Sequence, residues 1–198
     1  MRYSLPALLL LCSTLTGCAF SVHDVKVNYQ YNASVSQDLS TAKKAPVKIG
    51  EFKDERGMQN PRMIFNMQNL NGQTTTGGWQ AEKPVAEIVR DGISQGLEKA
   101  KLPLSDTSGQ LELRGELLEF DYKAIMGAWQ GTIQPRLMVK LQIVDSANRA
   151  IIWKDTLISK ASITGNTEIQ NYLKASIDQL VTDLLEDEYF LQKIKEGA

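Results

Sequence analysis

Two segments with helical periodicity enclose three segments with strand periodicity, and this order constrains the fold more than any other feature of the sequence. Apolar residues recur every three or four positions from Val85 to Ala100 and again from Ile169 to Leu185, so each helix has one apolar face. Between the helices, apolar and polar residues alternate over 111–122, 132–144 and 150–163. Because a helix with one apolar face must bury it, the pattern predicts two helices on one side of a β-sheet.

Two further strands and a hairpin precede the first helix. Residues 25–31 alternate as a half-buried strand does, and a second strand begins at Val47. The 62–76 stretch fits a hairpin in which Asn71-Gly72 supplies the positive φ angles of a type I′ turn. The strands on either side of the first helix should form a parallel pair. The order strand, strand, hairpin, helix, three strands, helix predicts an α+β two-layer sandwich, with two helices on one face of a mixed four- to five-stranded sheet.

Local departures from these patterns predict local irregularities. The alternation changes parity near Leu117-Leu118, which indicates a β-bulge. Pro135 near the start of its strand indicates an edge position or the first turn of the strand. Gly92 and Gly96 each cost about 1 kcal/mol relative to Ala in a helix. We therefore expect a close backbone approach at these glycines, to the sheet or to the second helix.

The N-terminus has the layout of a bacterial export signal, with Arg2, the apolar run Leu8–Leu11 and small residues before Cys18. The stretch Leu15-Thr16-Gly17-Cys18 resembles the lipobox of bacterial lipoproteins. The resemblance implies cleavage before Cys18, a diacylglyceryl group on its thiol and a third acyl chain on the new amino group. An ordinary secretory signal with an incidental cysteine is the alternative.

The lipobox divides the chain into a signal peptide (1–17), an acylated tether (18–24) and a single periplasmic domain (25–198). After the signal, no apolar run approaches the roughly 20 residues needed to span a bilayer, so the acyl chains of Cys18 would be the contact with membrane lipid. Two or more acyl chains make such anchoring stable. Ala19 departs from the Asp that retains lipoproteins in the inner membrane of enteric-type bacteria. The resemblance therefore implies the outer membrane, with the body facing the periplasm.

Composition excludes several classes of function. The 22 basic and 23 acidic residues give a net charge of −1, and no basic stretch is dense enough to follow a phosphate backbone, so we expect no nucleic acid partner. If the lipobox is processed, Cys12 would leave with the signal and Cys18 would be acylated, so no thiol would remain for a disulfide. His23 is the only histidine, and zinc sites normally draw on several His or Cys ligands. We expect no metal site and no cofactor.

One end of the predicted sheet gathers apolar residues. If the two strands flanking the first helix are parallel, the 57–80 hairpin and the 125–129 loop share that end and form one continuous surface. Its contact residues would be Phe65, Met67, Trp79, Ile125, Met126 and Trp129. Two interpretations stay open: these side chains pack over the end of the sheet as core, or they form a contact surface for a partner protein, a peptidoglycan-linked assembly or lipid.

The order of elements, taken with the lipobox, resembles the YajG-type periplasmic lipoproteins. Asp54-Glu55-Arg56 matches an Asp-x-Arg at the end of the first core strand of that family, and the Asn71 turn falls between that strand and the first helix. More loosely, the helix-backed sheet resembles the lipopolysaccharide-assembly and transport-auxiliary lipoproteins. These families imply non-catalytic roles in the cell envelope, carried out through protein contacts.

Asp54, Glu55 and Arg56 form the best polar cluster of the chain. An enzyme could use Asp54 as a general acid or base while Arg56 holds an anion; a strand-end salt bridge or turn cap is the alternative. We expect a protein that is not an enzyme, an envelope assembly or accessory factor with an envelope protein partner. A glycan- or lipid-binding module that uses the apolar end is the second hypothesis, and a hydrolase is the third.

Overall fold

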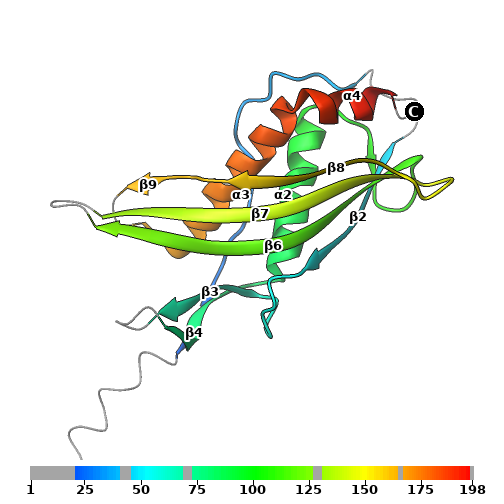
Figure 1. Ribbon diagram of the computed structural model, residues 1–198. Coiled ribbons are helices and arrows are strands. Elements are labelled where there is room, and N and C mark those ends of the chain that lie inside the picture. The colour runs from blue at the N-terminus through cyan, green and yellow to red at the C-terminus, as the bar shows by residue number, and fades with distance from the viewer. Residues whose placement is uncertain (1–20, 41–45, 69–72, 127–130, 165–166, 197–198) are drawn as a thin grey trace, which may run out of the picture.

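The computed structural model describes residues 21–40, 46–68, 73–126, 131–164 and 167–196 (Figure 1). Within these ranges the chain forms a six-stranded sheet, a three-stranded sheet and three helices. The α+β class and the placement of helices on one face of the large sheet agree with the sequence analysis. The large sheet has more strands than the four or five expected, and the predicted hairpin belongs to a second sheet.

The large sheet has the strand order β5-β2-β6-β7-β8, and β9 pairs with β7. As predicted, β2 and β6 are parallel, and β6, β7 and β8 follow as an antiparallel meander. The strands are β2 (Val47–Asp54), β5 (Leu104–Ser105), β6 (Leu111–Met126), β7 (Gly131–Asp145), β8 (Ile151–Ser159) and β9 (Ile163–Thr164).

Register shifts between neighbouring strands change which residues of the large sheet face the helices. The register of β2 against β6 shifts between Ile49 and Phe52, which is why the buried positions of β2 do not alternate strictly. The register of β6 against β7 shifts between Leu117 and Glu119. This second shift confirms the bulge predicted from the change of parity.

The short strands β5 and β9 were not predicted, because two residues are too few to show an alternating pattern. β9 pairs with β7 at Thr132 and Ile133, whereas β8 reaches β7 only from Leu137 onward. Pro135 lies between these two pairings, so its missing N–H removes no ladder bond on that side of β7. Its position is locally that of an edge, as the sequence indicated.

Helices α2 (Val85–Lys99) and α3 (Ile169–Glu186) pack side by side on one face of the large sheet (Figure 1). The glycines of α2 lie against α3: a Cβ added at Gly92 would lie 2.4 Å from Ile177, and one added at Gly96 would lie 2.1 Å from Val181. The predicted close approach at both glycines is therefore confirmed, and the neighbour is the second helix.

A third helix, α4 (Glu188–Glu196), follows α3 after a break at Asp187. The Asp187 carboxylate accepts hydrogen bonds from the backbone N–H groups of Tyr189 (2.8 Å) and Phe190 (3.0 Å), so it caps the new helix. Phe190 is buried and its ring packs edge-on against Trp153 of β8 at 5.1 Å between centroids. The α4 helix thereby packs against β8, an edge strand of the large sheet.

Residues 26–40, here called the strap, form no helix or strand, so the strand predicted over 25–31 is wrong. The strap is extended, and Val27 and Tyr31 are buried against the helices on the side away from the large sheet. Its backbone N–H groups bond to side chains instead of a strand: Val27 to the Glu82 carboxylate (2.8 Å) and Tyr31 to the Gln95 amide oxygen (2.9 Å). The alternating sequence pattern predicts correctly which residues of the strap are buried. It does not predict that the backbone N–H groups bond to side chains and not to a neighbouring strand.

The small sheet has the order β1-β4-β3, formed by β1 (Val22–Val25), β3 (Met63–Gln68) and β4 (Thr74–Ala81). The antiparallel pair β3–β4 confirms the predicted hairpin, whose Asn71-Gly72 turn lies outside the described residues. β1 pairs in parallel with β4. The fold therefore already includes residues 22–24, which the sequence analysis placed in the tether.

Candidate functional site

The Asp54–Arg56 cluster forms a strand-end salt bridge. The Arg56 side chain is only 2% exposed, and its guanidinium donates to both carboxylate oxygens of Asp54, at 2.8 and 2.6 Å. It also donates to the backbone carbonyl oxygens of Met63 (2.9 Å) and Pro61 (3.3 Å). The arginine therefore joins the end of β2 to the start of β3, which fits the structural alternative for this cluster.

The residues expected at the apolar end lie in different environments. Phe65 on β3 is 2% exposed, stacks on Phe120 of β6 at 4.6 Å between ring centroids and meets Tyr122 edge-on at 4.9 Å. The Phe65 side chain is part of the core between the two sheets. The prediction that Phe65 is a surface contact residue is therefore wrong. Met67 and Trp79 are half-buried, and the Trp79 ring lies 6.3 Å from that of His23.

Of the remaining residues of that prediction, Ile125 and Met126 belong to the described part of the chain. Ile125 and Met126 end β6, paired with Thr132 and Gly131. Trp129 and Cys18 lie outside the described residues, so the contact role of Trp129 and the acylation of Cys18 stay predictions.

A groove of about 200 Å³ lies between the two sheets, beside the Arg56 turn. Phe65 and Phe120 contribute apolar surface to it, and Glu119 and Asp121 contribute carboxylates. Burial, helped by the charge of Asp121, raises the pKa of the nearby Tyr122. β2 ends at its pairing with Leu117, so within the described residues β6 continues past this groove with no partner strand on that side.

The face of the large sheet opposite the helices is open and lined with charged side chains. Alternating positions of β2, β6 and β7 place these charges on one surface, where three pairs join neighbouring strands and the Arg114–Glu112 pair lies along β6 itself. The pairs are Lys48–Glu112 (3.0 Å), Arg114–Glu112 (2.5 Å), Lys140–Glu116 (2.9 Å) and Arg136–Glu119 (3.4 Å). Sequence reasoning missed this face, although Glu112, Arg114 and Glu116 alternate with buried residues.

A hollow of about 320 Å³ lies on this open face, lined by residues of β2, β6 and β7. Glu112 is its most buried carboxylate, at 7% exposure. The hydrogen bond from Arg114, together with Lys48, lowers the pKa of Glu112 despite its burial. Gly50 makes room for this side chain, because an added Cβ would lie 2.8 Å from the Glu112 carboxylate oxygen.

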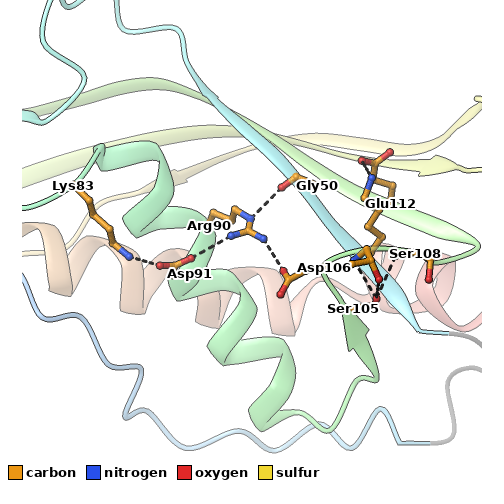
Figure 2. A network of polar contacts seen from close by, with 10 residues as sticks. Gly50, Lys83, Arg90, Asp91, Ser105, Asp106, Ser108 and Glu112 are labelled. Atoms are coloured by element: carbon orange, nitrogen blue, oxygen red, sulfur yellow. Dashed lines mark hydrogen bonds and ion pairs between the residues drawn. The ribbon is translucent and has the colours of Figure 1, made fainter.

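A polar network ties the helix layer to the edge of this face (Figure 2). Arg90 of α2 donates to the Gly50 carbonyl oxygen at 3.1 Å and to the Asp106 carboxylate at 2.7 Å. Arg90 also forms an ion pair with Asp91, which binds Lys83 as well. The network fixes the irregular part of β2 from behind, so it supports the geometry of the open face.

The comparisons with known proteins identify the fold. The chain matches no protein-family model and no curated protein sequence. It is similar to the crystal structure of a DUF330-family protein from Xanthomonas campestris, with a TM-score of 0.56 and 12% identity over 86% of this chain and 94% of that one. A weaker similarity is to a minor lipoprotein from Acinetobacter baumannii, with a TM-score of 0.33 and 18% identity over 55% of this chain and 84% of that one.

Two further observations concern the described part of the chain. None of its helices is both long enough and apolar enough to cross a bilayer. None of its His, Cys, Asp and Glu side chains gather in groups of three or more that could hold a metal ion.

Proposed function

We propose that this protein is an outer-membrane lipoprotein, anchored through acylated Cys18, that acts in the periplasm as a non-catalytic envelope accessory factor. The lipobox supports the anchor, and the short connection from Cys18 to β1 supports a body held close to the membrane. The Arg56 guanidinium is engaged by Asp54 and two backbone carbonyl oxygens, which supports a structural role for that cluster over a catalytic one.

The open, charge-lined face of the large sheet carries the proposal of protein contact. The two more exposed pairs, Lys140–Glu116 and Arg136–Glu119, contribute only about 0–1 kcal/mol each to stability, so stability gives little reason for them. Complementary charge patterns do give specificity and speed to protein association. The partner we expect is a protein whose surface charges are complementary to the open face.

A charge exchange on the open face tests this proposal. The double variant Glu116→Lys with Lys140→Glu keeps the ion pair and the net charge but inverts the pattern. A photoreactive amino acid at Gln142, on the same face, should give one discrete protein adduct in cells, and the exchange should abolish it. The same probe at Gln179, exposed on α3, is the control and should give none. An adduct that survives the exchange would refute the open face as the contact surface.

The anchor is tested separately by mass spectrometry of the protein isolated from cell envelopes. The N-terminal peptide should begin at Cys18 and carry three acyl chains, and it should fractionate with the outer membrane. An unmodified N-terminus would refute the lipoprotein assignment.

A further inference from the structure

The β3–β4 hairpin is free of charge along its whole length. From Met63 to Ala81 the sequence has no Asp, Glu, Lys, Arg or His, although 23% of the chain is charged. Charged residues stand directly on either side, at Arg62 and Glu82. The large sheet has the opposite character, with charges from three strands on its open face. The hairpin is therefore chemically distinct from the rest of the surface.

The register of the small sheet places the same hairpin beside β1, the first strand after the proposed anchor. β1 and β4 run parallel with Val22 opposite Gly78, and the Gly78 N–H donates to the Ser21 carbonyl oxygen at 3.0 Å. Cys18 precedes Val22 by the same number of residues as Thr74, the first residue of β4, precedes Gly78. An extended chain advances at most about 3.3–3.6 Å per residue, so Cys18 lies within about 14 Å of Val22.

The short distance between Cys18 and Val22 limits how the folded domain can be oriented on a membrane. Acyl chains on Cys18 lie in the hydrocarbon layer, so Val22 lies within about 14 Å of the point where they enter it. Thr74 and Thr76, which are exposed, and the half-buried Met67 lie on the turn side of this pairing, which is the side on which β1 begins. A charged segment held there would lose favourable hydration, whereas uncharged polar and apolar side chains are suited to the interface.

We propose that the β3–β4 hairpin is the membrane-contact element of the protein and lies in the headgroup region of the phospholipid bilayer that holds Cys18. The inference rests on the proposed acyl anchor and adds an orientation to it. The hairpin faces the bilayer, and the charged face of the large sheet stays in water. We expect this surface to bind a phospholipid bilayer for two reasons. The chain between Cys18 and β1 is short, and the hairpin has no charged residue.

Coupling the purified protein chemically to lipid allows the orientation to be tested whether or not Cys18 is acylated in the cell. The mature chain, residues 18–198, has Cys18 as its one thiol, so it can be coupled to maleimide-bearing lipid in vesicles of phosphatidylethanolamine and phosphatidylglycerol. A phospholipid with a diazirine in its headgroup is included and activated by light. Cleavage after Arg62 and Glu82 releases the hairpin as one peptide, and cleavage after Lys140 and Arg149 releases a control peptide from β7 and its turn.

We expect lipid adducts on the hairpin peptide to exceed those on the 141–149 peptide by at least about fivefold, since labelling follows distance from the lipid. Thr74→Asp should lower the hairpin yield severalfold, whereas the uncharged Thr74→Asn should leave it unchanged. Equal labelling of both peptides, or no loss with Thr74→Asp, would overturn the inference. So would a photoreactive amino acid at Thr76 that gives a protein adduct in cells and no lipid adduct. Since coupling is chemical, a missing acyl group in cells would refute the anchor alone.

Discussion

Replacing Gly96 by alanine tests how tightly the two long helices pack. In an exposed helix the change stabilises by about 1 kcal/mol, because alanine has the higher helix propensity. Here the new Cβ would lie 2.1 Å from Cγ1 of Val181, a buried side chain of α3. Val181 is β-branched and cannot rotate away freely, so the contact must open by shifting α2 against α3.

The expected net effect is a loss of stability. Overpacking a filled core costs about 1–3 kcal/mol, and a contact this short belongs at the upper end of that range. After the propensity gain is subtracted, Gly96→Ala should lower the free energy of unfolding by about 1–2 kcal/mol. Combining it with Val181→Ala should recover much of the loss, with a coupling energy of about 0.5–3 kcal/mol.

Urea unfolding of the mature chain carrying Cys18→Ser, followed by tryptophan fluorescence, measures these free energies. The propensity term is obtained within the same helix from the difference between Glu98→Ala and Glu98→Gly, because Glu98 is exposed. If Gly96→Ala stabilises the protein by as much as that difference, the helices are not in contact at Gly96 and the reasoning fails.

Three further predictions concern polar groups. Arg56→Met should cost about 3–5 kcal/mol in urea unfolding, because it leaves the Asp54 carboxylate, whose side chain is only 13% exposed, without its partner; an unchanged midpoint would contradict this. Glu112 has a lowered pKa in the fold, so its contribution to stability is complete above its ordinary pKa of 4.5 and is lost as the pH falls through the lower folded value. Glu112→Gln should therefore flatten the acid limb of the melting temperature against pH, and a parallel profile would refute the assignment. Tyr29 donates to Asp178 at 2.6 Å, and burial, with that bond, raises its pKa far above the ordinary 10.0. Stability should therefore fall as the pH rises above 10.0, and Tyr29→Phe should weaken that alkaline dependence while costing about 1.5–3 kcal/mol at neutral pH.

The helices and long strands were predictable because their burial is periodic. Apolar spacing placed α2 within a residue of its observed ends, and the change of parity at Leu117 located the bulge of β6. The strap was not predictable in the same way. Any extended chain buries alternate residues, whether its backbone bonds to a strand or to side chains such as Glu82 and Gln95. Periodicity therefore cannot distinguish the two.

The candidate site was predictable only in part. The close sequence spacing of Asp54 and Arg56 at a strand end was enough to propose their salt bridge. Phe65 was harder, because its burial depends on Phe120 of a different sheet, far away in the sequence. The open face was missed because each of its strands, taken alone, resembles an ordinary half-exposed strand. Only the register of β6 against β7 brings Glu116 and Lys140 together.

The position of β1 determines how a pull on the lipid would travel through the protein. Tension arriving from Cys18 would first load the four residue pairs between β1 and β4. It would next reach the strap, where the backbone N–H groups of Val27 and Tyr31 are hydrogen-bonded to the side chains of Glu82 and Gln95. The large sheet comes last along this route. A lateral force on the lipid would therefore separate β1 from β4 before it strained the large sheet, and the strands of the open face would keep their shape.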